Sequence, residues 1–146
     1  GRPQTREHIL LAKQVGLTGA GRQKPVIRAG NLSAVRDFTD VRDTVRAYWL
    51  ALEKGRPGEI YNVCSGKGRR VRDLLDGLLA RSRAKIKVRK EAGRLRKINV
   101  PRLVGNPSKF KRDTGWMPEI SFEKTLDDLL NDWRARVDIE ISRKGL

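Results

Sequence analysis

An α/β fold is predicted because helix-like apolar spacing and strand-like alternation follow one another along the chain, separated by glycine and proline. The helical spacing is clearest between Asp40 and Gly55, and the alternation is strictest in residues 85–89. No segment repeats another. Such an order of elements is typical of a sheet that is covered by helices.

The first third of the chain predicts one helix and one strand. Residues 4–15 have the composition of a helix, with Thr5 as its N-cap and Gly16 as its stop. Residues 25–30 predict a short strand. Residues 31–38 predict a loop or a short extended segment that leads into the next helix.

The next helix is the best-defined element of the sequence. Asp40 is its expected N-cap, Asp43 suits the positive end of the helix dipole, and Gly55 ends it. Its apolar residues recur every three or four positions and predict one buried stripe, made by Val41, Val45, Tyr48, Trp49 and Leu52. Residues 59–64 then predict a strand, with Tyr61 and Val63 on one face.

The second half predicts two further helices and one strand. Residues 71–79 form an amphipathic helix, and residues 85–89 form a strand whose Ile86 and Val88 face a core. A basic, glycine-containing loop follows from residue 91 to about residue 108. The last helix begins near Ser121 and is expected to bury Phe122, Leu126, Leu129, Leu130, Trp133 and Val137.

The overall composition fits a single domain, or a piece of a larger one, with a modest core. The chain has 146 residues, 38% of them hydrophobic, and a mean hydropathy of −0.60. No apolar run is long enough for a membrane span or a signal peptide, so a cytoplasmic location is expected. Cys64 is the only cysteine and reads as a small buried residue. His8 is the only histidine, which argues against a metal site or a catalytic triad.

Positive charge is concentrated in the middle of the chain. The formal net charge is +16, and residues 66–112 contain seventeen basic and three acidic residues. Such a field attracts polyanions, so RNA is a candidate partner. The candidate contacts are Arg69, Arg70, Arg72, Lys85, Lys87 and Arg89. The alternative is a merely solvated basic surface, and no RNA-binding signature is present.

Three blocks of sequence resemble one enzyme family. They are GRQKPVIRAGNLSAVRDFTDVRDTVRAYWLALEKG (21–55), GEIYNVCSGKG (58–68) and the series RLR, VPRLVGNPSKF and TGWMPEISFEKTL (94–126). In this order they resemble the carboxyl-terminal half of the extended short-chain dehydrogenases/reductases, NAD-dependent epimerase/dehydratase family. The branch is that of GDP-mannose 4,6-dehydratase and GDP-6-deoxy-hexulose reductase. The resemblance implies a partial Rossmann-like element plus the small substrate-binding subdomain.

The resemblance also implies a GDP-sugar site. Arg36 corresponds to an arginine that reaches the substrate diphosphate, a role that suits a guanidinium fork; the alternative is an ion pair with Asp37 or Asp40. Arg96 corresponds to the second diphosphate-binding arginine, although the proline and the acid of the family's Arg-Pro-x-acid segment are replaced here by lysine and by Asn99. Asn31 and Val35 correspond to the substrate-facing loop.

The family's chemistry needs features that this sequence does not contain. A glycine-rich turn holds the NADP pyrophosphate, and a tyrosine with a lysine four residues later works as acid and base. Here Tyr48 and Tyr61 are followed at that spacing by Leu52 and Ser65. The chain alone is therefore expected to bind no cofactor and to be inactive, although NADP serves the parent family.

Residues 3–16 (PQTREHILLAKQVG) resemble a helix of elongation factor Tu, but no phosphate loop or guanine motif accompanies them. This predicts a composite chain, or alternatively a drifted natural fragment. The predicted division is residues 1–19 as a helix and connection of uncertain origin, 20–137 as the nucleotide-sugar-binding portion, and 138–146 as a tail.

Two functions follow from different classes of protein. The first is the GDP-hexose-binding portion of a GDP-mannose 4,6-dehydratase-like or GDP-4-keto-6-deoxy-mannose reductase-like enzyme, completed by another chain or a larger assembly. The second is a basic structural or RNA-binding protein that reuses the half-fold.

Overall fold

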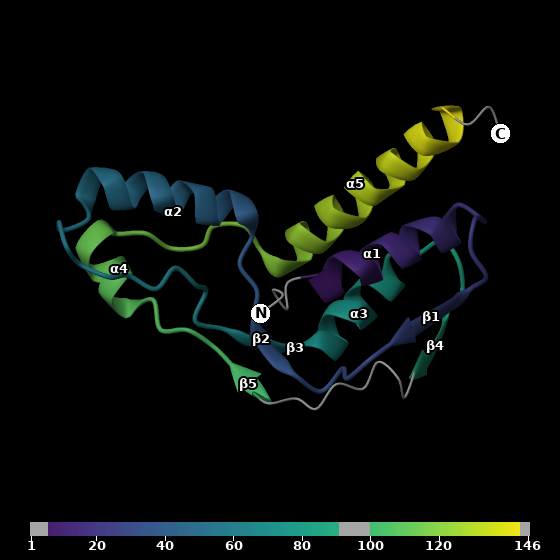
Figure 1. Cartoon of the computed structure of the whole chain (residues 1–146), viewed down its shortest axis with the longest axis horizontal. Coiled ribbons are helices and arrows are strands. Elements are labelled where there is room, and N and C mark those ends of the chain that lie inside the picture. Colours follow the sequence, from purple (N-terminus) through teal and green to yellow (C-terminus); the bar gives the residue numbers. More distant parts are fainter. Residues whose placement is uncertain (1–5, 91–99, 144–146) are drawn as a thin grey trace.

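The computed structural model describes residues 6–90 and 100–143 of the chain. Its helices and strands alternate, which confirms the α/β class (Figure 1). The helices are α1 (Arg6–Gly19), α2 (Val41–Lys54), α3 (Val71–Ala80), α4 (Ser108–Thr114) and α5 (Phe122–Arg143). The strands are β1 (Val26–Ala29), β2 (Val35–Asp37), β3 (Gly68–Arg70), β4 (Lys87–Lys90) and β5 (Arg102–Leu103).

The strands form two small sheets. β1 and β4 pair in parallel, with Ile27 opposite Val88. In the second sheet, β2 is the central strand: it pairs antiparallel with β3 and parallel with β5. This second sheet brings together segments from residues 35, 69 and 102, which lie far apart in the sequence. It is the part of the fold that positions the candidate site.

The larger core lies between α1, α3, α5 and the β1–β4 pair (Figure 1). As predicted, Ile86 and Val88 pack against this core, while Lys85, Lys87 and Arg89 are exposed. The predicted apolar face of α5 is also confirmed. Its members that are buried or packed against the core are Phe122, Leu126, Leu129, Leu130, Trp133 and Val137. The helical spacing in the sequence predicts this buried face correctly because the elements that pack against α5 belong to the same chain.

The smaller core joins α2, α4 and the segment that follows α2. Ala47, Phe110 and Trp116 are fully buried in it, and Tyr61 and Val63 pack against them. The aromatic rings meet in tilted pairs, with centroids 5.3 Å apart for Tyr61 and Phe110 and 5.6 Å apart for Phe110 and Trp116. Figure 1 shows α2 and α4 as a lobe separate from the bundle of α1, α3 and α5.

Helix α1 runs past the predicted stop at Gly16 and ends at Gly19. The reason is the packing of α1 against α5. A Cβ at Gly16 would lie 3.4 Å from Cβ of Trp133, so the glycine allows the two helices to approach closely. The residue is therefore a helix–helix contact and not a C-cap.

Two predictions differ from the structure in the smaller lobe. The apolar stripe of α2 was expected to be buried, yet all five of its members are exposed. The predicted strand at residues 59–64 has no strand partner among the described residues, although Tyr61 and Val63 do face the core. Helix α4 and the short strands β3 and β5 were not predicted, because segments of two to seven residues are too short to show a period.

No described helix has the length and apolar character needed to cross a membrane.

Candidate functional site

The central strand β2 presents different residues on its two faces. Arg36 lies opposite Arg69 of β3, so these two side chains share one face. Val35 lies opposite Arg70 of β3 on one side and Arg102 of β5 on the other, and these three share the other face. The predicted residues Val35 and Arg36 are thus adjacent in the strand but project to opposite faces. Both faces carry positive charge.

Arg36 is half-buried and, within residues 6–90 and 100–143, is not paired with an acid. Its Nη1 donates to the carbonyl oxygen of Val35 at 2.7 Å, and no carboxylate of the described residues forms an ion pair with it. The two acids proposed as alternative partners are occupied elsewhere: Asp37 accepts from Ser65, and Asp40 accepts from Arg42. As far as the described part of the chain is concerned, the remaining guanidinium N–H groups of Arg36 are therefore available to an anion.

Asn31 stabilises the loop that enters β2. Its Oδ1 accepts from the backbone N–H of Ser33 at 2.9 Å and from the hydroxyl of Ser33 at 2.7 Å. The loop is also tied to the start of α3, because the carbonyls of Leu32 and Ala34 accept from backbone N–H groups there. The oxygen of Asn31 is thus used inside the loop, and its side-chain N–H₂ is the part that can donate to a ligand.

Arg96 and Asn99 lie outside the described residues. The chain is described again from Val100, and the N–H of Val35 donates to the carbonyl of Pro101 at 2.9 Å. β5 therefore runs directly beside β2. This pairing places Arg102 next to Val35, a position that the sequence reasoning missed. The available signal was the basic block around residues 94–103, although a two-residue strand cannot be recognised by its pattern.

The six residues predicted to bind polyanions belong to two different parts of the fold, because β3 and β4 lie in different sheets. Arg69, Arg70 and Arg72 lie at β3 and the start of α3, whereas Lys85, Lys87 and Arg89 lie along β4 and the residues before it. Two of them already have partners. The guanidinium of Arg69 stacks 4.3 Å from the ring centroid of Phe122, and Arg72 forms an ion pair with Asp76 at 2.9 Å.

The glycine-containing turn at residues 65–68 binds an internal carboxylate. The oxygens of Asp37 accept from the backbone N–H groups of Ser65 and Gly66 at 2.9 and 2.8 Å, and from the hydroxyl of Ser65 at 2.5 Å. A dinucleotide phosphate needs those same N–H groups and would be repelled by the carboxylate. This turn therefore does not fit the NADP pyrophosphate.

Gly68 lets β2, β3 and the chain after β5 approach closely. A Cβ at Gly68 would lie 2.7 Å from Cγ2 of Val104 and 2.8 Å from Cγ1 of Val35. We expect Gly68→Ala to lower the free energy of unfolding by about 1–3 kcal/mol, the usual cost of overpacking. Chemical denaturation measures it. Gly19→Ala, where a Cβ would meet nothing within 4 Å, is the control, and equal stability of the two variants would contradict this packing.

Cys64 is half-buried beside Gly105, as the sequence suggested. Burial raises the pKa of its thiol, and the negative charge of Asp37 raises it further. The thiol therefore stays protonated near neutral pH and is a poor nucleophile.

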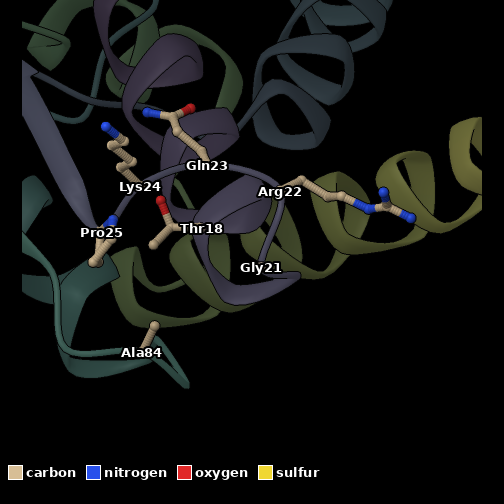
Figure 2. Close-up of a pocket in the computed structure, with 7 residues that line it drawn as sticks. All are labelled: Thr18, Gly21, Arg22, Gln23, Lys24, Pro25 and Ala84. Atoms are coloured by element: carbon tan, nitrogen blue, oxygen red, sulfur yellow. The ribbon is translucent and has the colours of Figure 1, made fainter.

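A hollow of about 480 Å³ lies beyond the carboxyl end of α1 (Figure 2). It is lined by Thr18, Gly21, Arg22, Gln23, Lys24, Pro25 and Ala84. Figure 2 shows the Arg22 side chain extending away from the other labelled residues. None of the predicted site residues that the structure describes lines this hollow, and its two cations, Arg22 and Lys24, are fewer than the four arginines of the β2 sheet.

Two buried carboxylates, Asp40 and Asp43, stabilise the start of α2 close to the candidate site. Hydrogen bonds from the Arg42 side chain hold the pKa of Asp40 well below its usual range, against the opposing effect of burial. For Asp43, burial alone would raise the pKa, but donors from the Ile120 amide, Arg46 and the Glu119 amide together lower it. Both carboxylates therefore stabilise the fold in their charged form.

Acid is expected to unfold the protein for this reason. Because the folded pKa values of Asp40 and Asp43 are depressed, their stabilisation is complete above the unfolded value of about 4 and is lost as the pH falls below it. Urea unfolding at pH 7, 5, 4 and 3 measures the effect, and most of the loss should fall below pH 4. The same free energy of unfolding at pH 3 and pH 7 would contradict the assignment.

Comparisons with known proteins identify the family of the chain. A family model described as GDP-mannose 4,6 dehydratase matches residues 3–129, a range that includes the segment resembling elongation factor Tu. GDP-6-deoxy-D-mannose reductase of Pseudomonas aeruginosa is 32% identical over 126 residues, which cover 86% of this chain and 41% of the relative. GDP-mannose 4,6 dehydratase 2 of Arabidopsis thaliana is 31% identical over 121 residues, or 79% of this chain and 30% of the relative.

A solved structure shows the same fold. The structure of RMD from Pseudomonas aeruginosa complexed with NADPH matches with a TM-score of 0.85 and 29% identity, over 93% of this chain and 45% of that one. The fold and the family model together place the chain in the class of extended short-chain dehydrogenases/reductases of the nucleotide-sugar type. Within that class, the chain belongs to the GDP-mannose 4,6-dehydratase family. It spans less than half the length of these relatives.

Proposed function

We propose that this chain is the GDP-hexose-binding portion of a GDP-mannose 4,6-dehydratase-like or GDP-4-keto-6-deoxy-mannose reductase-like enzyme. The sheet β3–β2–β5 holds the diphosphate. The chain alone binds the nucleotide sugar but does not convert it, because its sequence contains neither the glycine-rich cofactor turn nor a tyrosine followed four residues later by a lysine.

The observation that carries the proposal is the state of Arg36. It is a half-buried guanidinium in a central strand, it has no acidic partner among the described residues, and it lies opposite a second arginine. Keeping two unneutralised guanidinium groups side by side is unfavourable unless an anion compensates them. A diphosphate provides that compensation with fork-shaped hydrogen bonds.

The division of the polyanion candidates favours this function over RNA binding. A short diphosphate needs only the local charge at β2 and β3, whereas RNA needs a continuous basic track. Among the six candidates, Arg72 is already paired with Asp76, and the others lie at two separate places, at β3 and along β4 with the residues before it.

Titration calorimetry with GDP tests the proposal. We expect saturable binding at a single site, with an affinity that changes little between 50 and 300 mM salt because few phosphate charges are involved. Inorganic phosphate at equal concentration should bind much more weakly. Absence of GDP binding up to millimolar concentration would overturn the proposal, and tight RNA binding that collapses with salt would support the alternative.

A further inference from the structure

Arg69, the arginine opposite Arg36, is held by an aromatic ring. Its guanidinium carbon lies 4.3 Å from the centroid of the Phe122 ring, well within the ~6 Å reach of a cation–π contact. Arg69 is half-buried, and no acid of residues 6–90 and 100–143 forms an ion pair with it. A ring attracts the face of a guanidinium, whereas the N–H groups lie in the guanidinium plane. The contact with Phe122 therefore orients the cation without using its hydrogen-bond donors.

The Phe122 ring is itself fixed by two parts of the fold. Phe122 is the first residue of α5, and it packs against the larger core. Its ring centroid also lies 6.0 Å from that of Phe38, with the two ring planes tilted by 41°. Phe38 directly follows β2 in the sequence. The ring is thus held by α5 and by the chain that leaves β2, and it contacts a cation of β3.

This ring bears on the arrangement of the two arginines. Arg36 and Arg69 are directly opposite in the antiparallel pair of β2 and β3, where Cβ atoms lie about 4.5–5.5 Å apart. Two like charges at this spacing repel each other, and a flexible arginine side chain can relieve the repulsion by turning away. The attraction to Phe122 opposes this movement. It keeps two cations beside each other before any ligand arrives.

We propose that Phe122 is a positioning residue for the diphosphate. It holds Arg69 over its ring, so that Arg36 and Arg69 each donate to one phosphate group of GDP. The inference rests on the proposed function and deepens it. Two phosphate groups need two cations at a fixed spacing, whereas the single phosphate of GMP is satisfied by one guanidinium fork. Phe122 thus contributes to the preference of the site for GDP over GMP.

Calorimetric titration of GDP and of GMP tests this role in two variants. Phe122→Leu keeps an apolar side chain in the larger core but removes the π face, whereas Phe122→Tyr keeps both. We expect the leucine variant to bind GDP about three- to tenfold more weakly, the range of a cation–π contact, and GMP less than twofold more weakly. The tyrosine variant should match the wild-type protein within twofold. Thermal unfolding is recorded in parallel, and Phe122→Met replaces the leucine variant if that variant does not fold.

A double-mutant cycle shows whether Phe122 acts through Arg69. Adding Phe122→Leu to Arg69→Ala should cause no further loss of GDP affinity, because the cation that the ring positions is already gone. Trp133→Leu is the matched control. Trp133 is another half-buried aromatic residue of α5, and its ring also lies under cations, those of Lys13 and Arg136. Its replacement should change the GDP affinity less than twofold.

Side-chain NMR of Arg69 gives a result that does not depend on GDP. The Hε proton should carry an upfield ring-current shift in the wild-type and tyrosine proteins and lose it in the leucine variant. Absence of that shift in the wild-type protein would overturn the inference whatever GDP does. If the wild-type protein binds GDP, then an unchanged leucine variant, equal losses of GDP and GMP, or additive losses in the cycle would overturn this inference alone. Absence of GDP binding to the wild-type protein would overturn the proposed function, and this inference with it.

Discussion

Asp43→Ala is expected to lower the free energy of unfolding by about 3–5 kcal/mol, the cost of breaking a buried charged network. The carboxylate is almost fully buried. It accepts from the backbone N–H groups of Glu119 at 3.1 Å and Ile120 at 3.0 Å, and it forms an ion pair with Arg46 at 3.0 Å. These bonds join α2 to the segment between α4 and α5. Alanine leaves the N–H groups of Glu119 and Ile120 without this acceptor and removes one of the two carboxylates that pair with Arg46.

Urea denaturation at pH 7 measures this loss. Asp43→Asn keeps the size and one acceptor of the side chain, so it should lie between the wild-type protein and the alanine variant. Asp76→Ala removes an exposed ion pair with Arg72 and should change the stability by less than about 1 kcal/mol. If Asp43→Ala and Asp76→Ala were equally mild, Asp43 would not be the link between these elements.

Arg36→Ala is expected to weaken GDP binding about 10- to 100-fold, which corresponds to the ~1.5–3 kcal/mol of hydrogen bonds to a charged group. The physical reason is the loss of the unpaired guanidinium beside Arg69 in the central strand. Calorimetric titration of GDP measures the change. The variant also loses a hydrogen bond to the Val35 carbonyl, so its thermal unfolding is recorded in parallel to separate folding from binding.

Arg72→Ala is the matched control for Arg36. It removes the same charge from an exposed arginine that is already paired with Asp76. We expect less than a twofold change in GDP affinity. Equal losses for Arg36→Ala and Arg72→Ala would indicate a diffuse effect of net charge and would contradict a site at β2.

Local signals in the sequence were sufficient where the partner of an element lies within the chain. Asp40 was predicted to cap α2, and its side chain accepts from the backbone N–H of Arg42 at 2.9 Å. The alternation around Ile86 and the periodicity of α5 likewise matched the larger core. In each case the pattern identifies an apolar face of a helix or strand, and other segments of the same chain pack against that face.

The same kind of pattern gave a wrong prediction where none of the described residues packs against the apolar face. The apolar period of α2 was read as a core face, but Trp49 and Leu52 are 63% and 84% exposed. Residues 59–64 have strand alternation but no strand partner there. Periodicity identifies an apolar helix or strand face, but it does not show whether this chain or another one packs against that face.

The candidate site was only partly predictable. The resemblance predicts a substrate role for Arg36, which stays a prediction. Whether Arg36 pairs with Asp37 or Asp40 could be decided only from the structure, because both acids also bind donors distant in sequence, Ser65 and Thr125. Asp43 was expected to act on the helix dipole, whereas its main role is to bind two amides more than seventy residues away. Arg102 joined the site through a two-residue strand that leaves no sequence pattern.

The most direct test of the proposed GDP-hexose site is an amide NMR titration of the intact chain with GDP-mannose. The proposal predicts saturable shift changes confined to residues 31–37, 68–70 and 102–103, the loop and strands around Arg36. No changes at millimolar ligand would contradict it, as would changes centred on the hollow at residues 18–25 or spread over all basic segments.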